Sequence, residues 1–194
     1  MRALVLGGAG MLGHRLWREL DRHMEAFAAV RGPVDDYASL AWFDPRRVIG
    51  GVDVLSDADL DRAMSEARPD VVINAVGIVK QRRDSENATT TIAVNALLPH
   101  RLADRCAAAG VRLIQISTDC VFAGTKGAYT EHDAPDACDL YGRSKLLGEV
   151  NRDGCLTVRT STARCRWRGP TSSSTRSVSS SSGVTPGALP RRSR

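Results

Sequence analysis

Two residues of the stretch DLYGRSKLLGEV have types and a spacing that could perform acid–base chemistry. Tyr141 and Lys145 are four residues apart, so on a helix their side chains face the same side. A nearby ammonium favours the phenolate and lowers the pKa of a tyrosine from its ordinary value of about 10. Tyr141 would then exchange a proton near neutral pH. The same spacing also occurs by chance on surface helices, so the interpretation depends on the rest of the chain.

A glycine-rich turn at the amino end predicts a dinucleotide site. Residues 2–7 are typical of a short buried strand, and a helix follows with Leu12, Leu16 and Leu20 on one stripe. Glycines in such a turn let the backbone approach a pyrophosphate, and the helix amino terminus offers free N–H groups. The alternative is a turn that only packs a helix on a strand. The residues expected to bind the cofactor here are Gly7, Gly10, Met11, Leu12 and Gly13.

The second strand, MEAFAAVRG, indicates which dinucleotide is bound. The residue that recognises the ribose is expected near the end of this strand, and there the sequence has Arg31, not an acid. An arginine can accept a 2′-phosphate, which favours NADPH. Asp35 and Asp36 come late for the ribose, although a loop could bring one back, so NADH stays open. The alternative for Arg31 is a solvated loop arginine.

Strands and helices alternate along the chain, which predicts an α/β fold of the Rossmann type. We expect a doubly wound parallel sheet with helices on both faces and ligands at the carboxyl ends of the strands. Ser56 is expected to cap a helix that ends near Ala67, and Gly110 to end one that begins near Thr91. The predicted strands after the second are 48–53, 70–75, 111–117 and 156–159.

Further strand ends could contact the cofactor. The fourth strand ends in small residues against which a ribose could lie, and the third ends in an aspartate that could bind the adenine edge. An asparagine in the following helix could hold a water or a backbone carbonyl near Lys145. An ordinary turn, a solvated aspartate and a helix-surface asparagine are the alternatives. The residues are Asn74, Ala75, Val76 and Gly77, then Asp53 and Val54, and finally Asn95.

Composition limits the class of protein. The 194 residues suffice for one α/β domain, and no stretch has the length of a membrane span or the pattern of a secretory signal. Five scattered cysteines without metal-ligand spacing indicate free thiols, so we expect a cytoplasmic protein without a metal. The net charge of +5 does not indicate nucleic-acid binding, because residues 1–161 hold 20 basic against 22 acidic residues.

The excess positive charge belongs to residues 162–194, which differ from the rest of the chain. This segment is rich in Ser and Arg, has seven arginines, and lacks Ile, Phe, Tyr, Asp and Glu. Such a composition buries too little apolar surface to offset the entropy of ordering, so we expect a disordered tail after a domain formed by 1–161. A shift of the reading frame would produce this composition. A genuine basic tail that binds phosphates is the alternative.

Five blocks of sequence together resemble the extended short-chain dehydrogenase/reductase family, and within it the sugar-nucleotide reductases of the dTDP-4-dehydrorhamnose reductase type. The resemblance covers residues 1–161. It implies a catalytic triad of Thr118, Tyr141 and Lys145, with the last two also holding the cofactor. The blocks are GGAGMLG at 7–13, PDVVINAVG at 69–77, VNALLPHRLA at 94–103, ISTDCVFAG at 116–124 and LYGRSKLLGE at 140–149.

The resemblance also implies a substrate and exposes two departures. The expected reaction is the NADPH-dependent reduction of a 4-keto sugar on a nucleoside diphosphate, with Asp119 and Lys80 lining the pocket. Cys120 stands where relatives often have tyrosine. Such enzymes usually continue for about a hundred further residues that build much of the sugar-binding lobe, which is largely missing here. The alternatives are an epimerase or dehydratase of the same fold, or a non-catalytic dinucleotide-binding remnant or regulatory subunit. A homodimer is left open.

Overall fold

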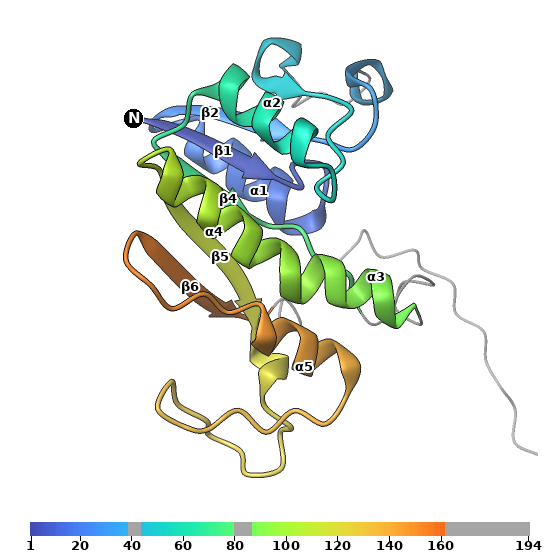
Figure 1. Cartoon of the computed structure of the whole chain (residues 1–194), viewed down its shortest axis with the longest axis vertical. Helices are drawn as coiled ribbons and strands as arrows, with labels where there is room; N and C mark the ends of the chain where they lie inside the picture. Colours follow the sequence, from blue (N-terminus) through green and yellow to red (C-terminus); the bar gives the residue numbers. More distant parts are fainter. Residues whose placement is uncertain (39–43, 80–86, 162–194) are drawn as a thin grey trace, which may run out of the picture. The chain divides into compact units, whose positions relative to one another are not determined.

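The computed structural model describes residues 1–38, 44–79 and 87–161. These residues form a six-stranded parallel sheet (Figure 1) in the order β3-β2-β1-β4-β5-β6. Its order reverses between β1 and β4, which is where open α/β sheets bind ligands. The strands are β1 (Arg2–Leu6), β2 (Glu25–Ala29), β3 (Val48–Ile49), β4 (Val71–Asn74), β5 (Arg112–Thr118) and β6 (Cys155–Thr160).

Helices lie on both faces of the sheet, as right-handed crossovers require. Helix α1 (Met11–Leu20) covers one face, where Trp17 packs with Ala3, Val5 and Ile73 and donates from Nε1 to the Ala26 carbonyl at 3.0 Å. The opposite face carries α2 (Asp57–Ala67) and α4 (Leu98–Ala108), whose buried leucines pack on β1, β4 and β5. The centre of the sheet is therefore buried between two apolar clusters, one on each face.

The helix that leads to β5 is interrupted by a π-helical turn. Helix α3 (Ala88–Ile92) continues into η4 (Ala93–Leu97) and then into α4. Pro99 has no N–H to donate to the carbonyl of Asn95, four residues earlier, so the regular α-helical bond is unavailable there. A Cβ on Gly148 would lie 2.0 Å from that carbonyl oxygen. Glycine therefore lets α5 (Leu140–Leu147) pack closely on this turn.

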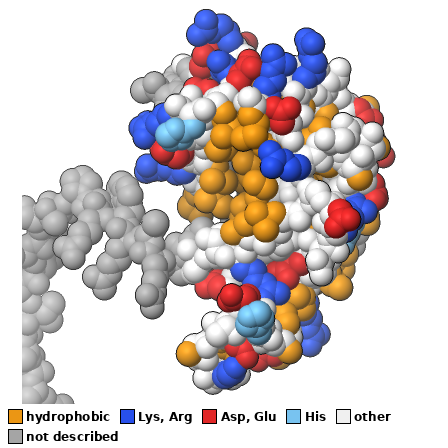
Figure 2. Space-filling view, turned by 90° about the vertical axis from the view of Figure 1, so that its left-hand side faces the viewer, with side chains coloured by type: hydrophobic (Ala, Val, Ile, Leu, Met, Phe, Trp, Pro, Cys, Tyr) orange, Lys and Arg blue, Asp and Glu red, His pale blue; other side chains and the backbone are white. Residues whose placement is uncertain are grey.

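One sheet face remains apolar and accessible where α1 does not reach. Ile114 and Ile116 of β5 are half-buried, and their register partners on β6, Leu156 and Val158, are 57% and 37% exposed. Figure 2 shows hydrophobic side chains gathered between charged ones on the face of the molecule that it presents. Among the described residues, no helix covers this part of the sheet.

The fold predicted from the sequence is confirmed, and two local predictions were wrong. Ser56 caps α2 through Oγ, which accepts from the Asp59 N–H at 3.3 Å, and Gly110 has a φ of +67° after α4. The third strand is shorter than 48–53, because Gly51 has a φ of +64° that turns the chain out of the sheet. The helix expected from Thr91 begins at Ala88 and contains the π turn.

Candidate active site

Lys145 lies at the centre of the candidate site and is 6% exposed. Its Nζ donates to the carbonyl oxygen of Ile116 at 2.7 Å, near the carboxyl end of β5. Burial lowers the pKa of Lys145 from 10.5 to about 8, while the nearby carboxylate of Glu149 opposes this by favouring the cation. Lys145 is therefore a buried ammonium at neutral pH, and it loses its proton at a pH slightly above neutrality.

Tyr141 lies one turn before Lys145 on α5, as the sequence predicted, and is half-buried. The helix begins at a capped position, where Asp139 Oδ1 accepts from the Gly142 N–H at 3.0 Å. A Cβ on Gly142 would lie 2.3 Å from the Cys120 carbonyl oxygen, so only glycine permits this close packing on the turn after β5. The start of α5 is thus fixed against the residues that follow Thr118.

Thr118 is the last residue of β5 and is 7% exposed. Its Oγ1 donates to Asp119 Oδ1 at 3.2 Å and accepts from the Cys120 N–H at 3.2 Å. The hydroxyl can therefore donate to another oxygen only after it turns away from Asp119. Asp119 was expected to line the substrate pocket, and Lys80, its expected companion, lies outside the described residues.

Asn95 is in the π turn and is 1% exposed. Its amide binds both backbone groups of one residue: Oδ1 accepts from the Ile78 N–H at 2.9 Å, and Nδ2 donates to the Ile78 carbonyl at 3.0 Å. Nδ2 also lies 3.2 Å from Ser144 Oγ, which neighbours Lys145. A Cβ on Gly77 would be 3.6 Å from Asn95 Oδ1 and 3.9 Å from Lys145 Nζ. Asn95 thus joins the segment after β4 to the lysine.

The glycine turn after β1 forms a close-packed cradle at the amino end of α1. Gly7 has a φ of +80°, and its carbonyl accepts from the Gly10 N–H at 2.8 Å. A Cβ on Gly13 would lie 2.1 Å from the same carbonyl oxygen, so α1 can approach β1 only with glycine at this position. Met11 is 77% exposed at the first turn of α1, and Leu12 is half-buried.

The turn after β4 lies against this cradle. Val76 Cγ2 would be 3.0 Å from a Cβ on Gly7, and the Ala75 carbonyl 3.3 Å. Asn74 is fully buried, donates to Gln115 Oε1 at 2.8 Å and accepts from the Val76 N–H at 3.1 Å. Its side chain therefore shapes the turn from within the protein.

The ends of β2 and β3 present both an arginine and acids. Arg31 is exposed, and no hydrogen bond or ion pair joins it to another residue in the described part of the chain. Asp36 lies near the end of β2, because its Oδ2 would be 3.0 Å from a Cβ on Gly32. Asp53 is exposed and accepts from the Leu55 N–H at 3.0 Å, and Val54 packs partly on the core. Geometry alone leaves the choice between the two dinucleotides open.

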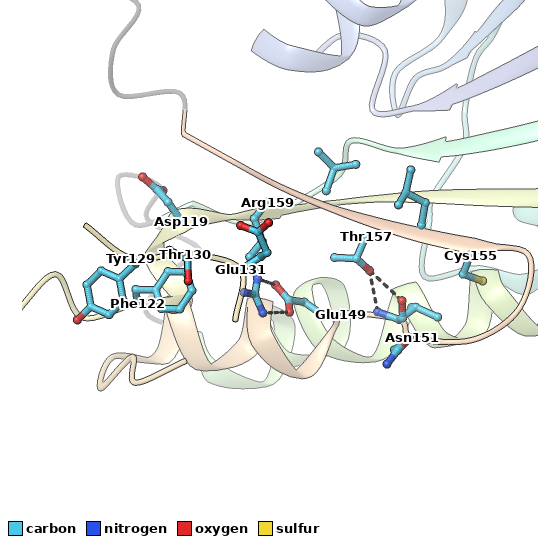
Figure 3. Close-up of a pocket in the computed structure, with 13 residues that line it drawn as sticks. Asp119, Phe122, Tyr129, Thr130, Glu131, Glu149, Asn151, Cys155, Thr157 and Arg159 are labelled. Carbon is cyan, nitrogen blue, oxygen red and sulfur yellow. Dashed lines mark hydrogen bonds and ion pairs between the residues drawn. The ribbon is translucent and has the colours of Figure 1, made fainter. Parts of the chain in front are cut away.

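Sequence reasoning assigned no role to Glu149 and Arg159, whose ion pair lies beside the candidate site. They line a hollow of about 720 Å³ together with Asp119, Phe122 and Tyr129, next to the edge strand β6 (Figure 3). None of Thr118, Tyr141 and Lys145 is among its described lining residues. The position of Glu149, four residues after Lys145, was the signal available in the sequence.

The described residues contain neither a membrane-spanning helix nor a metal-binding cluster. None of the helices in 1–38, 44–79 and 87–161 is long and apolar enough to cross a membrane. The same residues contain no cluster of His, Cys, Asp and Glu side chains that could hold a metal ion.

The strand order, the glycine turn after β1, Thr118 at the end of β5, and Tyr141 and Lys145 one turn apart on α5 define a protein of the short-chain dehydrogenase/reductase type. The profile of a family described as the RmlD substrate binding domain matches residues 1–164. The chain belongs to this family. The resemblance predicted from the five sequence blocks is thereby confirmed.

Curated relatives include a reductase and a protein described as a subunit. The chain is 33% identical over 149 residues to dTDP-4-dehydrorhamnose reductase of Streptomyces griseus, covering 76% of this chain and 43% of that protein. It is 30% identical over 150 residues to methionine adenosyltransferase 2 subunit beta of Bos taurus, covering 76% and 41%. The chain thus spans less than half the length of each.

Solved structures of related proteins have the same fold as this chain. A hypothetical dTDP-4-dehydrorhamnose reductase from Sulfolobus tokodaii has a TM-score of 0.69 and 28% identity, covering 82% of this chain and 55% of that one. The Bordetella bronchiseptica enzyme WbmG, solved in complex with NAD and UDP, has a TM-score of 0.60 and 27% identity, covering 76% and 47%.

Proposed function

We propose that this chain provides the cofactor-binding and proton-transfer half of an NADPH-dependent reductase that acts on a 4-keto nucleotide sugar. The proposed substrate is of the dTDP-4-dehydrorhamnose type, used in the cytoplasmic synthesis of dTDP-rhamnose or a related precursor of cell-surface polysaccharide. The observation that carries the proposal is the buried Lys145, with a pKa of about 8, one helical turn from Tyr141 and bonded beside Thr118. Perturbed lysines of this kind are typical of functional sites.

The residues present fit a nicotinamide dinucleotide. The Gly7–Gly13 cradle excludes Cβ atoms where a pyrophosphate would approach α1, whose first residue is Met11. The backbone of the Ala75–Gly77 turn would lie along the ribose, and Asp53 and Val54 would meet the adenine edge. Arg31 would accept the 2′-phosphate of NADPH. The WbmG complex contains NAD, so NADH stays the second choice.

Each member of the triad would act on one atom of the substrate or cofactor. The bound nicotinamide supplies the hydride. Thr118 would turn from Asp119 and donate a hydrogen bond to the carbonyl oxygen of the sugar, and Tyr141 would protonate that oxygen as charge develops on it. Lys145 would hold the nicotinamide ribose and, as an ammonium, lower the pKa of Tyr141. Asn95 would keep the lysine in place by fixing the peptide of Ile78 beside it.

Two other functions have specific support. An epimerase or dehydratase of the same fold uses the same three groups and returns the hydride to the sugar, so it would retain NAD tightly through purification. A non-catalytic regulatory role is favoured by the 30% identity to methionine adenosyltransferase 2 subunit beta. The non-catalytic role requires no sugar site, so it is compatible with the short span of this chain relative to the reductases.

The test compares this chain with a version whose reading frame is restored after Ser161. NADPH oxidation with a dTDP-4-keto sugar is followed by absorbance in both. We expect weak activity or none in this chain, because an open sugar site loses orientation and desolvation, and clear activity in the restored one.

Tyr141→Phe in the restored version should lower the rate about a hundred- to ten-thousand-fold while leaving cofactor binding nearly unchanged. The substitution keeps the ring and deletes the proton donor. An inactive restored version would eliminate the reductase assignment, and full activity in the present chain would show the additional residues to be dispensable.

A further inference from the structure

Glu149 and Arg159 form a two-point ion pair at the carboxyl ends of β5 and β6. Arg159 Nε donates to Glu149 Oε1 at 2.8 Å, and Arg159 Nη2 donates to Oε2 at 2.7 Å (Figure 3). Ser117 Oγ donates to Glu149 Oε1 at 2.7 Å. The two charged side chains are only 15% and 26% exposed. Paired, partly buried hydrogen bonds between ions are among the strong ones in proteins, so this cluster has one defined geometry.

The cluster holds the same short stretch of β5 that Lys145 contacts. Lys145 bonds to the carbonyl of Ile116, and Glu149, four residues later, bonds to the next residue, Ser117. Arg159 is the register partner of Ser117 on β6. Glu149 therefore ties the end of α5 to both strands, one residue before Thr118.

Glu149 also sets the charge that Lys145 meets. It is the carboxylate that favours the protonated lysine against the effect of burial. On the elements packed against α5, the other charged groups are Asp119, in the turn after β5, and Arg112, at the opposite end of β5; α3 and the π turn contain none. Arg143 lies on α5 itself, and Arg159 lies on β6, which pairs with β5. Arg159 neutralises part of the charge of Glu149. The two side chains thus act on Lys145 with opposite signs.

We propose that Glu149 is a positioning residue: together with Arg159 and Ser117 it keeps Lys145 charged and fixes the lysine relative to Thr118. The effect of Glu149 on catalysis rests on the proposed function. The geometric and electrostatic part concerns this chain alone and can be measured without substrate.

The experiment follows the titration of the lysine side chains by NMR in the full chain. The sequence has three lysines, Lys80, Lys126 and Lys145, so labelled lysine gives few signals, and Lys145→Arg assigns the third. Glu149→Gln should lower the titration midpoint of Lys145 by roughly 0.5 to 1 pH unit, the order expected for loss of one charge near a part-buried group. Arg159→Gln should raise it by a similar amount, because Glu149 then acts without a counter-charge.

Two controls separate this effect from damage to the fold. Unfolding would return Lys145 toward its ordinary, higher pKa, so a fall in Glu149→Gln cannot arise from unfolding. Ser117→Ala removes the neutral hydrogen bond and keeps both charges, so the Lys145 midpoint should stay within roughly 0.2 pH unit. Lys126, which is exposed and pairs with Asp133, serves as the internal reference signal in every sample.

An unshifted or raised midpoint in Glu149→Gln would overturn the proposal, as would shifts of the same sign in the glutamate and arginine variants. NADPH is titrated into the same samples. If the predicted shifts occur and NADPH does not bind, the positioning role stands and the proposed reductase function fails. If NADPH binds and the shifts are absent, the positioning role fails and the proposed function is unaffected.

Discussion

Replacing Lys145 with methionine should stabilise the protein at neutral pH and remove a specific part of its pH dependence. Methionine has a similar length and carries no charge, so it can occupy the site without the cost of burying an ammonium. The folded protein lowers the pKa of this lysine from 10.5 to about 8. Between these values the unfolded chain binds more protons than the folded one. The contribution of Lys145 to the stability of the wild type therefore rises as pH increases from 8 to 10.5, and the penalty for burying its charge is largest below pH 8.

The magnitude follows from the two pKa values. At pH 7 the charged lysine costs about 3 kcal/mol relative to an unperturbed one, and at pH 10 the remaining cost is about 1 kcal/mol. Lys145→Met also leaves the Ile116 carbonyl without its donor, a loss of about 1–3 kcal/mol that does not vary with pH. The net gain at pH 7 is thus small. The difference in unfolding free energy between the variant and the wild type should nevertheless fall by about 2–2.5 kcal/mol from pH 7 to pH 10.

Urea unfolding of both proteins at pH 7, 8, 9 and 10, with a reductant present, measures this difference. The thiols and tyrosines that titrate in the same range are common to both proteins and cancel. Lys126→Met provides a matched control, because Lys126 is exposed and its removal should give a difference that is nearly constant over this range. A constant difference for Lys145→Met as well would refute the argument that the lysine is buried as a perturbed cation.

Two further predictions concern the cofactor and the segment after β6. Arg31→Ala should weaken NADPH binding by about 1–3 kcal/mol and affect NADH binding little, because it removes a charge-assisted hydrogen bond to the 2′-phosphate. Fluorescence titration with both cofactors measures this. Asp36→Asn is the companion variant, which should instead strengthen the preference for NADPH. Tighter binding of NADH by the unmodified chain would contradict the cofactor assignment. Limited proteolysis should remove residues 162–194 first, because a segment of this composition lacks the apolar residues to join a core. A protected segment with ordered secondary structure would argue against a shifted reading frame.

Local patterns in the sequence were sufficient for the elements that are specified by their own residues. The Ser56 cap, the Gly110 stop and the Tyr141–Lys145 spacing each depend on residues within one helix, and each is found where expected. The π turn was not predicted, because it arises from Pro99 together with Gly148, which is about fifty residues away and becomes its neighbour only in the folded chain. Periodicity within a window contains no information about such contacts.

Side-chain partners across strands escaped prediction for the same reason. Asn74 was expected at a strand end against whose backbone a ribose could lie, and the sequence did not indicate that its amide bonds to Gln115 on the adjacent strand. The direction in which a strand-end side chain points depends on register, which the sequence leaves open. The Glu149–Arg159 pair depends likewise on the pairing of β5 with β6.

The candidate site has two parts, the surroundings of Lys145 and the surroundings of a bound sugar. Three contacts among the described residues position Lys145: the Ile116 carbonyl accepts from its Nζ, Asn95 bonds to the preceding Ser144, and Glu149 bonds to Ser117, which follows Ile116. The surroundings of a sugar are different, because the hollow beside β6 is open and the apolar face of β5 and β6 has no cover among these residues. Cofactor binding and the state of the lysine should therefore be properties of this chain, whereas reduction of a sugar should require the additional length that the curated reductases have. Restoring the reading frame after Ser161 should accordingly raise the rate of NADPH oxidation and leave the titration midpoint of Lys145 unchanged. A shift of that midpoint in the restored version would show that the sugar site and the surroundings of Lys145 are coupled.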